Sequence, residues 1–120
     1  MSSTFQTFLF KLLLYVALIA ITTLAFLPDY DALPPIVSFS DLLNHTVAFF
    51  TLYLLMYLAH PKLQAIHIAT LLLIYGIFIE FVQYFLPTRF ASWSDVAADS
   101  VGLVLGFIII TLYTKIKQIK

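Results

Sequence analysis

The sequence predicts an all-α integral membrane protein, an antiparallel bundle of four transmembrane helices with both termini in the cytoplasm. Three observations support this class. Of the 120 residues, 62% are hydrophobic and 10% are charged, whereas a soluble domain has roughly 25% charged residues. The mean hydropathy is +1.04, and the apolar residues form runs close to the ~20 residues that cross a bilayer. The lysines and arginines are unevenly divided between the polar connections, which sets the orientation.

Composition also limits the partners and the chemistry. The sequence contains no cysteine, so neither disulfide bonds nor thiolate catalysis is available. The formal net charge is zero and the basic residues lie mainly near the two ends, which leaves no basic patch for nucleic acid. We therefore expect one transmembrane domain over residues 1–120, with membrane lipids as its surroundings and no nucleic-acid partner.

The first span is predicted over residues 9–27, where an apolar run continues on both sides of Lys11. A cleaved signal peptide has a similar form, with a positive flank before a short apolar core. Residues 23–25, Thr-Leu-Ala, make a poor cleavage site, and three more spans follow, so a retained helix is favoured. Three prolines within residues 28–40 exclude a continuous helix there and predict an ordered loop.

Three further spans are predicted over residues 42–59, 63–86 and 93–113. Ser40 and Asp41 have the small oxygen-bearing side chains that accept the free N–H groups of a first helical turn. Short connections follow, at residues 60–62 and 87–92. Four spans with short connections favour an antiparallel bundle.

Orientation follows from the basic residues, which gather on the cytoplasmic side of a membrane protein. Lys11, Lys62 and the lysines of the C-terminal tail fall on one side, and Arg89 falls on the other. The sequence therefore predicts that both termini and residues 60–62 face the cytoplasm, whereas residues 28–40 and 87–92 face outward.

Polar residues of the last three spans are predicted to meet at one depth. Asp41 and His45 are four residues apart, as are Asp95 and Asp99, and Glu80 and Gln83 are three apart. Each pair therefore lies on one side of its helix. At a rise of about 1.5 Å per residue, all of them fall in the outer leaflet. Ionisable residues at such depths mark working sites by default. The set comprises Asp41, His45, Glu80, Gln83, Asp95 and Asp99.

Structural explanations exist for individual members. Asp41 is better explained as a helix cap, and Ser92-x-x-Asp95 has the form of a capping box. Glu80 could hold the bundle together through His45 or Arg89, a contact worth ~1 kcal/mol. For the six residues together a purely structural explanation is weaker, because four carboxylates face one arginine and one histidine. The excess negative charge must be protonated, solvated or bound to a cation, which predicts an outward-opening polar pocket.

Small residues recur every four positions along the last span. Such a ridge lets a second helix approach closely. Asp95 and Asp99 border the ridge, so close packing would bring both carboxylates to a neighbouring helix. The ridge comprises Ser94, Ala98, Gly102 and Gly106.

Four motifs together resemble the VanZ-like family of small bacterial membrane proteins. They cover roughly residues 40–106, in the family's order and spacing. Two positions depart from the family pattern: Leu42 stands where lysine is usual, and Asp99 where asparagine is usual. Both departures make the site more negative, which favours a cation or a protonated carboxyl there. The motifs are Asp41-x-x-Asn44-His45, Gly76-x-x-x-Glu80-x-x-Gln83, Pro87-x-Arg89 and Ser94-Asp95-x-x-Ala98-x-x-x-Gly102.

The resemblance implies a multi-pass protein of the bacterial cell (inner) membrane. The family takes its name from a member associated with resistance to the glycopeptide teicoplanin. This implies a lipid-linked cell-wall precursor, another cell-envelope lipid or a glycopeptide as partner, and a contribution to teicoplanin resistance.

We expect the site to act on, or bind, an amphiphilic cell-envelope lipid. In an enzyme, His45 and Glu80 would share general acid–base work, and Arg89 would take a phosphate or carboxylate. No compact ligand motif specifies a metal, although a divalent cation at Asp95 and Asp99 suits their charge. The substrate-binding set is Asp41, Asn44, Gln83, Arg89, Asp95 and Asp99.

Two alternatives stay open. A non-catalytic binder would hold a precursor or drug headgroup in the same pocket and reduce antibiotic access at the membrane. A proton or ion pathway uses similar residues, but the inner half of the spans supplies no continuation beyond His45 and Asp99, so it ranks below the other two.

Overall fold

Four long helices make up the part of the chain that the structure, a computed structural model, describes: residues 3–26, 41–86 and 93–119. They are α1 (Ser3–Ala25), α3 (Asp41–Ala59), α4 (Ala65–Tyr84) and α5 (Trp93–Ile119). Each is long and apolar enough to cross a membrane. The all-α class and the multi-pass character predicted from the sequence are confirmed. The predicted loops at 28–40 and 87–92 lie outside the described residues.

Three helix ends explain most of the difference from the predicted spans, and α1, α3 and α4 each differ by one or two residues at one further end. Helix α1 begins at Ser3 and α5 continues to Ile119, because neither flank contains a glycine or proline to stop the helix. Helix α4 begins later than expected, at Ala65, since the residue at its N-cap position, Gln64, is extended (φ −78°, ψ 157°). The chain between Pro61 and Gln64 is a turn and not part of the third span.

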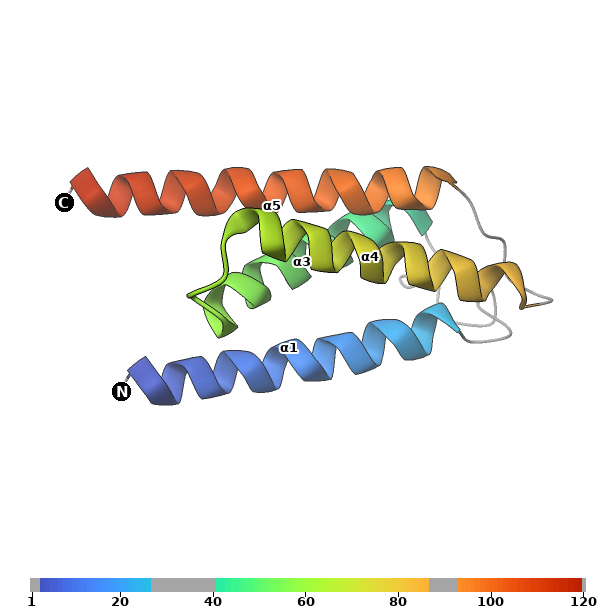
Figure 1. Ribbon diagram of the computed structural model, residues 1–120, viewed down its shortest axis with the longest axis horizontal. Helices are drawn as coiled ribbons and strands as arrows, with labels where there is room; N and C mark the ends of the chain where they lie inside the picture. Colours follow the sequence, from blue (N-terminus) through green and yellow to red (C-terminus); the bar gives the residue numbers. More distant parts are fainter. Residues whose placement is uncertain (1–2, 27–40, 87–92, 120) are drawn as a thin grey trace.

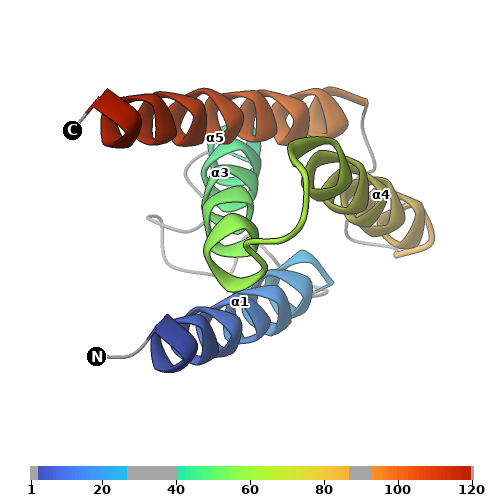
Figure 2. The same ribbon diagram turned by 60° about the vertical axis from the view of Figure 1, so that its left-hand side comes forward.

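Helix α3 is the centre of the bundle. Figure 2 shows α3 between α1 and α5, with α4 beside it, and α3 contacts all three neighbours. In Figure 1 the start of α1 and the end of α5 lie at the same end of the long axis. The apolar core between the helices includes Leu14, Phe49, Leu52, Ile68 and Leu72.

The outer surface of the bundle is apolar, whereas several interior side chains are charged. Ile19, Ile66 and Phe81 are each more than 60% exposed, but Glu80, Asp95 and Asp99 are buried. Helices with apolar residues on every side suit a membrane, and carboxylates within a membrane bundle face its interior. The described helices follow this pattern.

The small-residue ridge of α5 packs directly on α3. A Cβ on Gly102 would lie 2.9 Å from the backbone nitrogen of Phe50, and one on Gly106 would lie 2.7 Å from Tyr53 Cβ. The Thr46 hydroxyl also donates to the carbonyl of Ala98 at 3.2 Å. The predicted close approach of a second helix is therefore confirmed.

Replacing Gly102 with alanine should destabilise the bundle, although alanine is the better helix former. The added methyl group meets backbone atoms of α3, which cannot rotate away, and such overpacking costs about 1–3 kcal/mol. Denaturant-induced unfolding in detergent micelles measures the loss. Ala97 lies on the exposed face of the same helix, so Ala97→Val serves as the control. Equal stability of G102A and the parent would contradict the packing argument.

Candidate functional site

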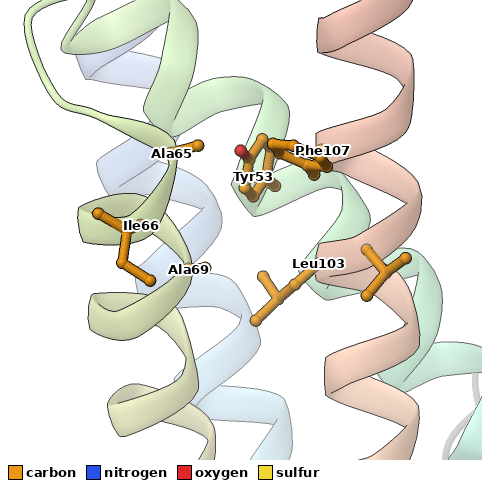
Figure 3. Close-up of a pocket in the computed structure, with 7 residues that line it drawn as sticks. Tyr53, Ala65, Ile66, Ala69, Leu103 and Phe107 are labelled. Atoms are coloured by element: carbon orange, nitrogen blue, oxygen red, sulfur yellow. The ribbon is translucent and has the colours of Figure 1, made fainter.

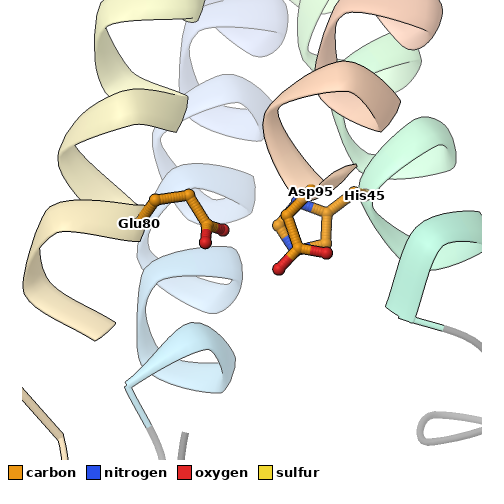
Figure 4. A group of neighbouring side chains, drawn as sticks. All are labelled: His45, Glu80 and Asp95. Carbon is orange, nitrogen blue, oxygen red and sulfur yellow. The ribbon is translucent and has the colours of Figure 1, made fainter. Parts of the chain in front are cut away.

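Four ionisable side chains from three helices meet inside the bundle. We call His45 of α3, Glu80 of α4, and Asp95 and Asp99 of α5 the polar cluster. The exposed fractions of Glu80, Asp95 and Asp99 are 7%, 7% and 0%. Figure 4 shows the side chains of His45, Glu80 and Asp95 turned toward one another. Four of the six residues that the sequence placed at one depth are thus brought together.

The imidazole of His45 is held between two carboxylates of α5. Nδ1 of His45 lies 2.6 Å from Oδ1 of Asp99, and Nε2 lies 3.8 Å from Oδ2 of Asp95. When Asp99 is ionised, its oxygens only accept hydrogen bonds, and Nδ1 then donates its proton to Asp99. This hydrogen bond fixes the ring and directs Nε2 toward Asp95.

Helix geometry explains how both carboxylates reach one ring. Asp95 and Asp99 are four residues apart, so they lie on the same face of α5. The glycine ridge on the neighbouring face brings α5 close to α3, where His45 is one turn from the helix start. The distance between Nδ1 and Asp99 is therefore a product of the packing between α3 and α5.

Glu80 approaches the same ring from α4. One candidate ligand atom each from His45, Glu80 and Asp95 lies within 4.8 Å of the other two. The sequence paired Glu80 with His45 as acid and base, and this pairing stays a prediction. The described residues also show a hydrogen bond of His45 with Asp99. The carboxylate of Glu80 remains near the ring, on the opposite side of the cluster from α3 (Figure 4).

Gly76 makes room for Asp99. A Cβ on Gly76 would lie 2.5 Å from Oδ2 of Asp99 and 3.2 Å from Cζ of Phe49. Any larger residue would therefore displace the carboxylate or separate α4 from α5. The sequence placed Gly76 on the stripe that carries Glu80, but gave no sign that it faces Asp99.

Gln83 has a contact that the sequence did not predict. Its Nε2 donates to the carbonyl oxygen of Ala25, at the end of α1, over 2.9 Å. Its Oε1 is buried and has no hydrogen-bond partner among the described residues. The predicted substrate-binding role of Gln83 is untested, and the amide nitrogen already serves to hold α1 against α4.

The other predicted site residues divide into two groups. Asn44 is half-buried on α3, directly before His45. Asp41 is the first residue of α3, but its side chain is not among those described. Arg89, and Ser92 of the supposed capping box, lie outside the described residues. Their predicted roles remain predictions.

Helix α1 contributes contacts near the site that sequence reasoning missed. The hydroxyl of Thr22 hydrogen-bonds with that of Tyr75, which also donates to the carbonyl of Leu18 at 3.4 Å. The ring of Tyr75 in turn lies 5.9 Å from that of Phe49, centroid to centroid. Thr22, a polar residue within an apolar run, was the one sequence signal for these contacts.

A bundle of spanning helices around a buried carboxylate–imidazole cluster defines a class of multi-pass membrane protein with an interior polar site. The chain belongs to the VanZ/LLP1 family, whose family model matches residues 3–114. This match confirms the resemblance seen in residues 40–106 and extends it over α1. Neither the curated proteins nor the solved structures contain a match to the chain.

The arrangement can hold and move protons or hold a cation. Three carboxylates surround one imidazole, so carboxylates outnumber basic groups within the polar cluster. Isolated charges are very costly away from water. Shared protons, water or a positively charged partner would each lower this cost.

Removing the imidazole of His45 should leave the buried Asp99 carboxylate without this hydrogen bond and so lower the stability of the protein. We expect His45→Ala to lower the free energy of unfolding by about 3–5 kcal/mol, because Asp99 loses its donor. The double variant H45A/D99N should recover part of this loss, since an amide carries no charge. Unfolding of H45A, D99N and the double variant in detergent micelles gives a double-mutant cycle. We expect an interaction energy between the two side chains of about 0.5–3 kcal/mol.

The exposed His67 supplies the control for this cycle. His67→Ala should change stability by less than about 0.5 kcal/mol. Additive effects of H45A and D99N would show that the two side chains do not depend on each other.

Proposed function

We propose that this protein takes the headgroup of an amphiphilic cell-envelope lipid into the polar cluster and performs acid–base chemistry on it. The observation that carries the proposal is the orientation of His45. Its Nδ1 is tied to Asp99 at 2.6 Å, so Nε2 is presented toward Asp95 on the side that Glu80 approaches. A ring held in one orientation by a carboxylate is the usual form of a histidine acid or base.

An apolar pocket supports an amphiphile as the ligand. The pocket has a volume of about 370 Å³, and Figure 3 shows its residues on α3, α4 and α5. Leu103 of the pocket follows Asp99 by one turn, so pocket and cluster share the side of α5 that faces α4. Its lining residues are Tyr53, Ala65, Ile66, Ala69, Leu103, Val104 and Phe107.

The spacing between cluster and pocket matches a lipid chain. Phe107 follows Asp99 by eight residues and Ala69 precedes Glu80 by eleven, which gives about 12 Å and about 16 Å along the helices. One leaflet of hydrocarbon is about 15 Å thick. A lipid with its headgroup at the cluster would thus place its acyl or polyprenyl chain along the pocket.

We also propose that the four helices cross the bacterial inner membrane in alternating directions, with both termini in the cytoplasm and the cluster toward the outside. Two contacts support this arrangement: Tyr15 of α1 meets His60, which follows the end of α3, whereas Gln83 near the end of α4 meets Ala25 at the end of α1. The basic residues Lys62 and Lys117 would then lie in the cytoplasm.

Chemical labelling tests this topology, and the parent chain without cysteine is its background. In intact cells, a membrane-impermeant maleimide should label Asp31→Cys. It should label Lys117→Cys only after the membrane is permeabilised. The opposite pattern would reverse the orientation and place the cluster on the cytoplasmic side.

Turnover by the purified full-length protein tests the chemistry. With a phospholipid, a lysophospholipid or a polyprenyl diphosphate-linked precursor as substrate, H45A and E80Q should each reduce turnover by about 10²–10⁴-fold. His67→Ala should leave turnover unchanged. Product formation is measured by mass spectrometry of the extracted lipids.

Two other results would point to the alternatives. Lipid binding without turnover would favour a non-catalytic binder. That binder would modulate antibiotic access, and its overexpression would shift teicoplanin tolerance without changing the lipid composition. We propose that the protein contributes to glycopeptide resistance through such a shift in tolerance. Ion flux in vesicles would favour a pathway, although the buried charged and amide residues of the described chain are confined to Glu80, Gln83, Asp95 and Asp99.

A further inference from the structure

We propose that His45, Glu80 and Asp95 bind one divalent transition-metal cation of the zinc or manganese type. The three side chains come from three different helices and are all at least half-buried. The proposal goes beyond the lipid chemistry, because cation binding needs no lipid and is measured without one. While the cation is bound, Nε2 of His45 is a ligand and does not act as the acid or base.

The positions of the donor atoms suit a single ion. One donor atom each from His45, Glu80 and Asp95 lies within 4.8 Å of the others, and Nε2 of His45 is 3.8 Å from Oδ2 of Asp95. Ligands that bind one ion at about 2.0–2.2 Å are roughly 3.5 Å apart. Side-chain movements of about 1 Å would therefore complete three coordination bonds, with further positions for water or a headgroup oxygen.

Asp99 gives independent support for the site. It is 0% exposed, and its Oδ1 accepts the hydrogen bond from Nδ1 of His45. Histidine ligands of metals almost always donate their second N–H to such an acceptor, which fixes the ring for coordination through the other nitrogen. The second oxygen, Oδ2, is buried beside Gly76 and has no hydrogen-bond partner among the described residues. A nearby dication would stabilise this buried negative charge.

Charge and donor type select the class of cation. Two carboxylates and a neutral imidazole balance a dication, which lowers the cost of charge away from water. Calcium and magnesium prefer oxygen donors alone, whereas an imidazole nitrogen suits zinc and other transition metals and carboxylates suit manganese. One nitrogen with two carboxylates therefore favours Zn²⁺ or Mn²⁺ over Ca²⁺ or Mg²⁺.

Metal content of the full-length protein tests the proposal. The protein is purified in detergent without a polyhistidine tag, treated with a chelator and equilibrated with Zn²⁺, Mn²⁺ or Mg²⁺. We expect one equivalent of Zn²⁺ or Mn²⁺ per chain. Calorimetry should show at least ~100-fold weaker binding for H45A, E80Q and D95N, and ~10–100-fold weaker binding for D99N. The exposed His67 provides the matched control, and His67→Ala should bind as the parent does.

A spectroscopic measurement on the parent protein avoids dependence on variants that fail to fold. X-ray absorption of the zinc complex should show nitrogen and oxygen ligands with the scattering of one imidazole. The proposal is overturned if the parent binds no stoichiometric Zn²⁺ or Mn²⁺, if folded H45A and D95N bind undiminished, or if the spectrum contains no imidazole. Failure of lipid turnover alone would leave the cation site intact.

Discussion

The hydrogen bond between His45 and Asp99 is the contact on which the arrangement of the site depends. It joins the first turns of α3 to those of α5 at a distance of 2.6 Å, and the glycine ridge permits that distance by letting the backbones approach. A buried carboxylate without a donor would be severely destabilising. The same bond therefore fixes the helix pair, the orientation of the imidazole and the position of Asp95.

The distribution of polarity explains why the site lies where it does. Outward-facing side chains such as Ile66 and Phe81 suit hydrocarbon, so the charged groups have the bundle interior as their only inexpensive location. The polar cluster occupies the end of α4 and the starts of α3 and α5. The apolar pocket follows along the same seam, and this sequence of a polar site and an apolar pocket is the basis of the proposed amphiphilic ligand.

Much of this architecture was predictable from hydropathy and spacing. The four helices, the meeting of His45, Glu80 and the two aspartates, and the packing ridge follow from the period of the α-helix and the cost of charge in hydrocarbon. The pairing within the cluster was not predictable, because residues one turn apart on a face cannot be distinguished by spacing alone. The contact of Gln83 with the Ala25 carbonyl was equally hidden, since a backbone acceptor leaves no trace in the sequence. The start of α1 was placed too late and the end of α5 too early, because their polar residues resemble tails, although nothing there interrupts a helix.

Gly76 and Asp99 touch across the boundary between α4 and α5, with no space for an additional methyl group between them. The two positions are therefore sterically coupled. A bulkier residue at 76 is compatible only with a shorter one at 99, and aspartate or asparagine at 99, which are alike in size, each restrict 76 to glycine. A change that enlarges one side chain thus demands a compensating reduction on the other helix.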